Sequence, residues 1–323
     1  MTATRIRFGT ERTLRVDDAP AVTEILAAIE RAEPTDEALS EQDVRDELGA
    51  PDVDLPRASI GVLDGDRLVG FGVLQFSVPT EVWKVAVVGG VHPDYVGRGI
   101  GRRIPEILQA DAQAIRDSEA PGLPGLFRVW VPEGRSRTAA LADAVGLETW
   151  RYFLRMRRDL GDPLPAPTMP NGVLIRPYKA SDELAVMEVS NASFADHWGS
   201  TPLDIERWRA EYTEASWFRP EFSQVAVIDD QLVGFVFVVE YDAETELRGY
   251  RSGYLSRVGT LRRARGRSVA STLIATTLQQ LCAAGFRCAE LGVDAESLTG
   301  AGRLYERLGF VTTARDSLVG RKF

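Results

Sequence analysis

The sequence predicts two tandem α/β domains, each with a mixed central sheet flanked by helices. The main observation is an internal repeat: VLDGDRLVGFGVLQF at Val62–Phe76 closely matches VIDDQLVGFVFVVEY at Val227–Tyr241. Matches around Thr13 and Leu174, and around Val91 and Thr260, keep the same order at a nearly constant offset. Ordered self-similarity of this kind indicates duplication of one folding unit.

A second observation places the boundary between the two copies. The segment GDPLPAPTMPNG, residues 161–172, contains four prolines and interrupts the hydrophobic periodicity. Such a composition is typical of a linker. We therefore expect an N-terminal domain at residues 1–160, a linker at 161–172 and a C-terminal domain at 173–323.

Each copy shows the same succession of expected elements, namely a strand, helices, a hairpin, a strand, a glycine-rich loop, a helix, a strand, a helix and a final strand. The hairpins are predicted from paired hydrophobic runs around Asp64-Gly65-Asp66 in the first copy and Asp229-Asp230 in the second. The strand–loop–helix units after the hairpins predict partly parallel pairing. The fold class is therefore α/β, or α+β in some schemes, with mixed sheets.

Composition limits the classes of function. The 323 residues carry 38 basic and 47 acidic side chains, a net charge of −9. This balance argues against nucleic acid or an anionic membrane as a partner. No run of about 18 apolar residues is present, and the start MTATRIRFGT lacks the apolar core of a signal peptide. We expect a cytoplasmic location.

Two cysteines, Cys282 and Cys288, are the only ones in the chain. They have no partners at metal-ligand spacing, so we expect no metal site, and we interpret both as buried small hydrophobic residues in a reducing compartment.

A glycine-rich loop in the first copy predicts an anion site. Gly97, Gly99 and Gly101 lie where an apolar strand passes into a helix, with Arg98 between them. Glycine permits close backbone approach, and the free amides of a helix start favour a pyrophosphate. The loop has neither Rossmann nor P-loop spacing, and a plain surface turn is the alternative. Pro105 is expected to interrupt the following helix, and His92 to be a turn residue.

The corresponding loop of the second copy reads Arg265-Gly266-Arg267-Ser268-Val269-Ala270. Serine replaces the central glycine at position 268. Because serine is a good N-cap, we expect Ser268 to cap the following helix and to donate to a bound anion. That helix, SVASTLIATTLQQLCAAG, is amphipathic and ends on glycine.

The pattern V-x-P-x-x-x-G-R-G-x-G beginning near Val91, followed by a helix, resembles motif A of the GNAT acyltransferase superfamily. The resemblance covers both halves of the chain. It implies that acetyl-coenzyme A binds with its pyrophosphate on the loop amides and its pantetheine arm along the preceding strand. The implied ligands in the second copy are Val258, Gly259, Thr260, Arg265, Gly266, Arg267, Ser268, Val269, Ala270 and Ser297. In the first copy they are Val91, Gly97, Arg98, Gly99, Ile100 and Gly101.

The stretch VDAESLTGAGRLYERLGF resembles motif B of the same superfamily. The resemblance implies that Tyr305 protonates the departing thiolate; a core tyrosine is the alternative. Ser297 stands where asparagine is common in the family, and Leu298 where proline often occurs. In the first copy Ala142 occupies the tyrosine position, so we expect catalysis in the C-terminal domain and a degenerate N-terminal copy.

The same resemblance implies that the stretch NASFADHWGSTPLDIERW, Asn191–Trp208, occupies the helical insertion that shapes the acceptor pocket. It contains Asp196, His197 and Trp198, which together suit a cationic or sugar-like amine. A structural role is the alternative for the histidine.

No general base is evident in the second copy. The strand YLSRVGT carries no carboxylate, and its Tyr254 is a distant candidate. Glu240 and Glu290 are expected to be solvated strand-end charges. Proton removal through water is therefore the default prediction.

These features predict an acetyl-CoA-dependent N-acetyltransferase acting on a primary amine of a small molecule. An aminoglycoside, a polyamine, an amino acid or a protein N-terminus all remain possible acceptors. The alternative function is a non-catalytic acyl-CoA-binding sensor or scaffold, and a third class is a structural partner protein without a ligand. A monomer and a homodimer are both compatible with the sequence.

Overall fold

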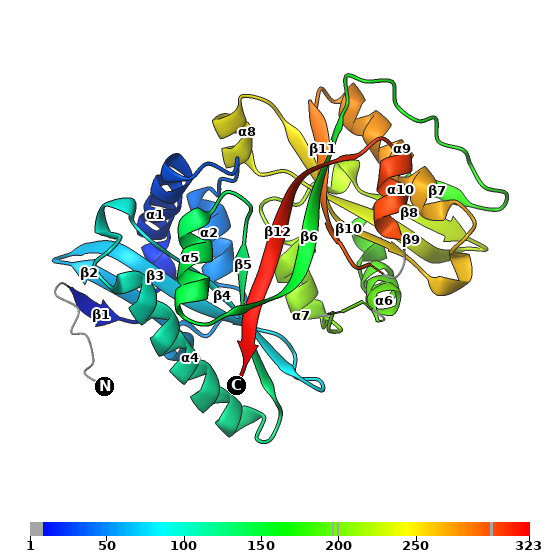
Figure 1. The fold of residues 1–323 in the computed structure, drawn as a ribbon. Coiled ribbons are helices and arrows are strands. Elements are labelled where there is room, and N and C mark those ends of the chain that lie inside the picture. The colour runs from blue at the N-terminus through cyan, green and yellow to red at the C-terminus, as the bar shows by residue number, and fades with distance from the viewer. Residues whose placement is uncertain (1–8, 196, 199, 298–299) are drawn as a thin grey trace. The chain divides into compact units, whose positions relative to one another are not determined.

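The computed structural model (Figure 1) describes residues 9–195, 197–198, 200–297 and 300–323. It divides into two compact units. Unit 1 contains residues up to Tyr152 together with Asp316–Phe323, and unit 2 contains Phe153–Arg315. Residues 161–172, expected to be a linker, are irregular in structure but lie within unit 2.

Unit 1 is built on a sheet with the strand order β1-β2-β3-β4-β5-β12. Its strands are β1 (Thr10–Arg12), β2 (Ser59–Asp64), β3 (Arg67–Phe76), β4 (Trp83–Val91), β5 (Gly125–Val131) and part of β12 (Val311–Lys322). Its helices are α1 (Ala19–Ala32), α2 (Glu41–Leu48), α3 (Leu55–Ala58), α4 (Ile100–Glu119) and α5 (Ser136–Ala144), with short 3-10 turns at Val16–Asp18 and Pro93–Tyr95. Strands β4 and β5 are parallel, and the remaining pairs are antiparallel.

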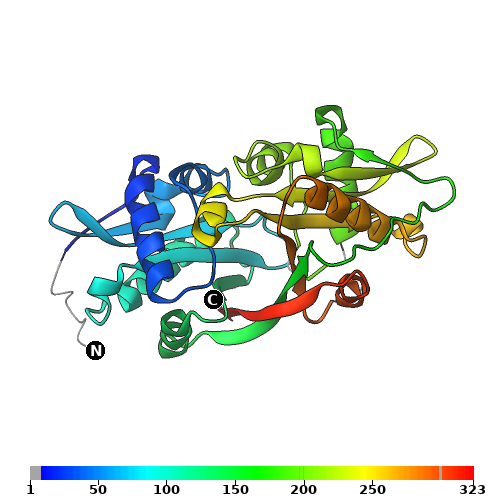
Figure 2. The ribbon, with the colours of Figure 1, turned by 90° about the horizontal axis from the view of Figure 1, so that it is seen from above.

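Two hydrophobic clusters cover the two faces of the unit 1 sheet. On one face α1 and α2 pack through residues such as Ile25 and Val44 against Phe71. On the other face α4 packs through Ile104 against Val85 and its neighbours. Figure 2 shows the blue α1 and the blue-green α4 of this layered arrangement.

Unit 2 repeats this plan with the strand order β7-β8-β9-β10-β11-β6. Its strands are β7 (Leu174–Pro177), β8 (Gln224–Ile228), β9 (Gln231–Val239), β10 (Ser252–Thr260), β11 (Cys288–Asp294) and part of β6 (Glu148–Asp159). Its helices are α6 (Glu183–Phe194), α7 (Ile205–Trp208), α8 (Asp242–Arg248), α9 (Val269–Ala283) and α10 (Ala301–Arg307). A π-helical turn at Arg209–Thr213 and 3-10 turns at Ala180–Asp182, Pro220–Phe222 and Arg262–Ala264 complete it.

Helices cover both faces of the unit 2 sheet as well. Helix α9 packs through Leu273 and Leu278 onto one face. An aromatic cluster that includes Trp208 and Phe235 joins α6 and α7 to the other face. We call the sheet face that α6 and α7 cover the acceptor face of unit 2, because the predicted acceptor segment follows α6 on this side. The corresponding face of unit 1, covered by α1 and α2, takes the same name.

Each unit is completed by a strand from the other half of the sequence. In unit 2, β6 pairs antiparallel with β11, from Asp159 opposite Cys288 to Phe153 opposite Asp294. In unit 1, β12 pairs antiparallel with β5, from Ser317 opposite Val131 to Lys322 opposite Leu126. The two structural units therefore differ from the two sequence copies that a boundary at 161–172 would separate. The final strand of each sequence copy belongs to the sheet of the other unit.

Both predicted hairpins are confirmed. β2 and β3 are joined at Gly65-Asp66, and β8 and β9 at Asp229-Asp230. Asp229 and Asp230 have φ angles of 48° and 59°, as a two-residue turn between twisted strands requires.

Two sequence predictions about helix α4 and the cysteines are wrong. Pro105 does not interrupt α4, because it lies in the second turn and the helix continues to Glu119. The only backbone bond it removes is the one to the carbonyl of Gly101. Cys288 is buried as expected, whereas Cys282 is exposed near the end of α9. None of the described helices has the length and apolar character needed to cross a membrane.

Candidate functional site

The central feature of unit 2 is a gap between two parallel strands. β10 pairs with β11 only from Ser252 to Tyr254, opposite Cys288 to Glu290. Its other edge stays paired with β9 as far as Thr260, with a bulge between Leu255 and Arg257. Among the described strands, none pairs with the β11 side of β10 beyond Tyr254. The backbone groups of Val258 and Gly259 on this edge are therefore available to a ligand.

The predicted phosphate loop lies at the open end of this gap, between β10 and α9. Gly266 has a φ of 75°, and a Cβ there would meet no atom within 4 Å. Within the described chain, no amide from Gly266 to Ala270 donates a hydrogen bond to the protein. These amides, at the N-terminus of α9, are therefore available as hydrogen-bond donors, which is the chemistry that an anion requires.

The two arginines of this loop also hold neighbouring segments. Arg265 donates to the carbonyls of Thr260 and Ser193, at 3.3 and 3.1 Å. Arg267 is exposed and donates to the carbonyl of Asn171 at 3.2 Å. Arg267 therefore keeps most of its donors for an external anion.

The expectation for Ser268 is wrong in its geometry. Ser268 precedes α9, but it adopts a left-handed conformation (φ 60°, ψ 16°) and its side chain makes no capping bond. The equivalent residue of unit 1 is Gly99, with φ 89°. The loop therefore requires a positive φ at this position, which serine adopts only with strain.

Tyr305 lies on α10, whose preceding loop follows β11. The side chain is 8% exposed and packs edge-to-face against Phe310, with ring centroids 6.0 Å apart. Burial raises its pKa to about 12. Among the described residues its hydroxyl has no hydrogen-bond partner, so it is a protonated donor that the protein itself does not use. Ser297 lies in the same loop, where its amide donates to the carbonyl of Asp294 at 3.0 Å.

Unit 1 contains the same gap and loop without the tyrosine. β4 pairs with β5 only as far as Val87, opposite Val129, while its pairing with β3 continues to Val91. Gly97 and Gly99 have positive φ angles and open space where a Cβ would be, and Ile100 and Gly101 form the first turn of α4. Ala142 is buried on α5.

Two side chains near the unit 1 loop have structural roles. His92 is confirmed as a turn residue, because it accepts a hydrogen bond from the Asp94 amide at the start of a 3-10 turn. Arg98 stacks over the ring of Tyr95 at 4.4 Å and donates to the carbonyl of Asp94.

The predicted acceptor segment follows α6. Asp196 lies outside the described residues. The amide of His197 donates to the carbonyl of Phe194 at 2.9 Å, and the two rings are 4.7 Å apart. Trp198 is 38% exposed. Asn191 bonds to both the carbonyl and the amide of Leu203, which fixes the two ends of the segment.

Arg257, which the sequence analysis did not single out, connects this segment to β10. Its guanidinium lies 4.1 Å from the ring centroid of Phe194 and donates to Ser190 and Tyr212, at 2.6 and 2.8 Å. The signal that the sequence offered was an arginine within the apolar strand YLSRVGT. Its position on the acceptor face makes it a candidate specificity residue.

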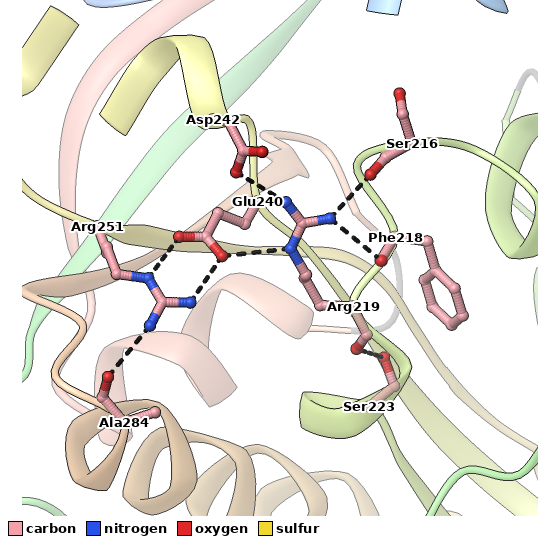
Figure 3. A network of polar contacts seen from close by, with 8 residues as sticks. All are labelled: Ser216, Phe218, Arg219, Ser223, Glu240, Asp242, Arg251 and Ala284. Carbon is pink, nitrogen blue, oxygen red and sulfur yellow. Dashed lines mark hydrogen bonds and ion pairs between the residues drawn. The ribbon is translucent and has the colours of Figure 1, made fainter. Parts of the chain in front are cut away.

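Glu240 is not the solvated charge that the sequence suggested. It is 4% exposed and lies between two arginines (Figure 3). Arg251 approaches it with two bonds of 2.7 and 2.8 Å and Arg219 with one of 3.3 Å. Burial opposes ionisation, but the bonds from Arg251 and Arg219 outweigh it and lower the Glu240 pKa. Glu240 is therefore a structural anion and not a proton acceptor.

Glu290 is also paired. It accepts hydrogen bonds from Arg248 at 2.6 Å and from Ser252 at 2.7 Å. Because Glu290 is the last β11 residue paired with β10, these contacts hold it at the closed end of the gap.

The residues present fit acetyl-coenzyme A. A free strand edge suits the amides of a pantetheine arm, and the loop amides suit a pyrophosphate. The hydroxyl oxygen of Thr260, at the junction of edge and loop, is buried without a partner in the described structure. Within the same residues, no group of three histidine, cysteine or acidic side chains is placed to hold a metal. Fold and site together define an acyl-CoA-dependent transferase.

Comparisons with known proteins agree with this class. Residues 184–310 match the Acetyltransferase (GNAT) family. A protein named mycothiol acetyltransferase from Streptomyces scabiei is 32% identical over 314 residues, covering 94% of each chain. The chain belongs to the GNAT acetyltransferase family.

Solved structures show that the tandem arrangement is shared. A GCN5-related N-acetyltransferase from Sphaerobacter thermophilus has 25% identity and a TM-score of 0.72, covering 97% of this chain and 95% of that one. A tandem GNAT protein from the clavulanic acid biosynthesis pathway has 19% identity and a TM-score of 0.71, covering 97% and 98%. The protein is thus an N-acetyltransferase with acetyl-CoA as its acetyl donor.

Proposed function

We propose that unit 2 transfers the acetyl group of acetyl-CoA to the primary amine of a small molecule by direct attack, with Tyr305 as the general acid. The observation that carries the proposal is the hydroxyl of Tyr305, which is buried, protonated and without a hydrogen-bond partner among the described residues, on the helix that follows the gapped strand β11. Acetyl-CoA supplies an activated thioester. Donation of a proton from Tyr305 to the departing sulfur would stabilise the charge that develops there.

The other protein groups position the reactants. The amides of the loop from Gly266 to Ala270 would hold the pyrophosphate, with Arg265 and Arg267 beside it. The free edge of β10 at Val258 and Gly259 would align the pantetheine arm, and Thr260 and Ser297 would donate to it. No carboxylate stands on β10, so water on the acceptor face would accept the proton of the amine.

For the acceptor we propose an amine related to mycothiol, the compound in the names of the relatives. Among the described residues, the acceptor side would include His197, Trp198 and Arg257. An aromatic face beside a cation and an imidazole suits a polar, sugar-like amine. Deacetylated mycothiol is therefore the first acceptor to test, against a polyamine and a free amino acid as controls.

Unit 1 differs in the one group that acid catalysis needs. Its loop retains Gly97 and Gly99, and a free edge of β4 ends at Val91. With Ala142 in place of a tyrosine, unit 1 would bind acetyl-CoA without turnover.

Calorimetric titration with acetyl-CoA tests the assignment of the two units. We expect Arg267→Glu to weaken binding at unit 2 and to reduce acetylation, and Gly99→Glu to affect only a second binding event. If Gly99→Glu alone abolished acetylation, the catalytic half would be wrongly assigned. Binding in the wild type with no acetylation of any amine would favour the acyl-CoA sensor.

A further inference from the structure

Two cations of unit 1 lie together on the acceptor face of its sheet. Arg128 on β5 pairs with Ala86 on β4, and Lys84 stands two residues before Ala86. The intervening residues Val85 and Phe127 point into the α4 core. Because side chains alternate along a strand, Lys84 and Arg128 point to the opposite face, as diagonal neighbours within reach of each other.

Neither cation has a counter-charge among the residues that the structure describes. Within the described chain, the ammonium of Lys84 and the guanidinium of Arg128 make no hydrogen bond, ion pair or ring contact. Both side chains are only partly exposed. Burial lowers the pKa of Arg128. Burial, and then the charge of Arg128, lower the pKa of Lys84. Leaving cations desolvated and unpaired is unfavourable, so their retention favours a role in binding an anionic ligand.

The position of the pair indicates a ligand site. The last parallel pair between β4 and β5 is Val87 opposite Val129, so Arg128 lies at the closed end of the unit 1 gap. Val88 and Trp130 follow on the same face and are 36% and 42% exposed. The site therefore combines two cations with apolar side chains at the mouth of the gap, a composition typical of small-molecule pockets.

Unit 2 shows what replaced the pair. In unit 1, Arg128 lies opposite Ala86 on β4 and Gly320 on β12. In unit 2, Glu290 lies opposite Tyr254 on β10 and Arg157 on β6. Glu290 therefore occupies the position in unit 2 that Arg128 occupies in unit 1. Unit 2 thus has a carboxylate at this position, and its charge is met by Arg248. In unit 1 the residue at this position, Arg128, is positively charged. Among the described residues, Arg128 has no oppositely charged partner.

We propose that unit 1 carries a second small-molecule site, in which Arg128 and Lys84 hold an oxyanion, a carboxylate or phosphate, at the closed end of the gap between β4 and β5. The guanidinium fork matches such a group in two bonds, and the ammonium adds a point charge. The oxyanion has two possible sources. One is a free anionic metabolite, and the other is the acidic end of an acyl chain whose CoA portion lies in the unit 1 gap. The inference is independent of the chemistry at Tyr305.

Calorimetry on the full chain at fixed ionic strength tests the site with four probes: succinate, inorganic phosphate, acetyl-CoA and succinyl-CoA. Arg128→Gln and Lys84→Gln each remove one charge while keeping a polar side chain. Arg31→Gln, an exposed arginine on α1, is the matched control for the change in charge. Thermal unfolding and acetylation by unit 2 check that each variant is folded.

We expect at least one oxyanion probe to bind the wild type and the Arg31→Gln control alike, and to bind each of the other two variants at least tenfold more weakly. Binding of succinate or phosphate alone would identify a free anion. A preference for succinyl-CoA over acetyl-CoA that both variants lose would identify an acyl chain. Absence of oxyanion binding in the wild type at millimolar concentration, or binding that neither substitution weakens, would overturn the proposal. If Arg128→Gln fails to fold, Lys84→Gln alone tests the proposal, because Lys84 is partly exposed and its replacement should leave the fold intact.

Discussion

Replacement of Tyr305 by phenylalanine separates a catalytic hydroxyl from a core aromatic ring. The ring is 8% exposed and keeps its contact with Phe310 in the variant. The hydroxyl has no partner among the described residues, so its loss breaks no hydrogen bond. We therefore expect the free energy of unfolding to change by less than about 1 kcal/mol. General acid catalysis contributes roughly 10²–10⁴-fold, so kcat should fall by about 100-fold or more.

The assay follows release of free thiol from acetyl-CoA at saturating amine, together with thermal unfolding. Tyr178→Phe is a matched control, because burial also raises the pKa of Tyr178 to about 12, and its ring packs edge-to-face against Phe218 and Phe237. The control should keep full kcat. Since the Tyr305 pKa is about 12, the wild type should show no loss of this acid between pH 6 and 10. Unchanged kcat in Tyr305→Phe would refute the reasoning and leave Tyr305 as a core residue.

Three further predictions concern strain and charge. Ser268→Gly removes a left-handed serine, so thermal unfolding should show a gain of about 1 kcal/mol with acetyl-CoA affinity retained; a loss of stability would contradict the strain. Glu240→Gln leaves two arginines facing a neutral group and should cost about 3 kcal/mol at pH 7. Because the folded pKa of Glu240 is lowered, this difference should shrink in denaturant titrations as the pH falls below about 4.5. The pKa shift of Glu47 has the opposite sign to that of Glu240, because burial and nearby acids such as Asp43 raise the folded pKa of Glu47 to about 7. The free energy of unfolding of the wild type should therefore decline between pH 4.5 and 7. Glu47→Gln should therefore be more stable than the wild type by about 3 kcal/mol at pH 8 and nearly equal to it near pH 4.5.

Features that depend on neighbouring residues in the chain could be predicted from the sequence. The turn at Asp229-Asp230 and the loop at Gly97 and Gly99 are specified by short hydrophobic patterns and by residues that tolerate positive φ. The family assignment followed from the spacing of the same residues, and the comparisons confirm it.

Features that depend on distant residues could not be predicted in this way. Glu240 looked like a strand-end charge, because Arg219 and Arg251 reach it only through the folded chain. Ser268 matched the composition of an N-cap, but the geometry required of the loop overrides that preference. The exchange of the final strands leaves no local signal, since β6 and β12 have an ordinary strand composition.

That exchange bears on how the protein is made. Unit 1 contains residues up to Tyr152, yet the side of β5 that faces away from β4 is paired by Ser317–Lys322, from the end of the sequence. Phe323 then closes the pairing through two backbone bonds with Gly125, at 2.9 and 3.0 Å, and its ring lies beneath the guanidinium of Arg116. During synthesis on the ribosome, β5 of unit 1 lacks its β12 neighbour until the residues of unit 2 and then Ser317–Lys322 have been translated. Each half of this duplicated chain therefore supplies a strand to the sheet of the other, and a chain cut at residues 161–172 would leave each sheet without one of its strands.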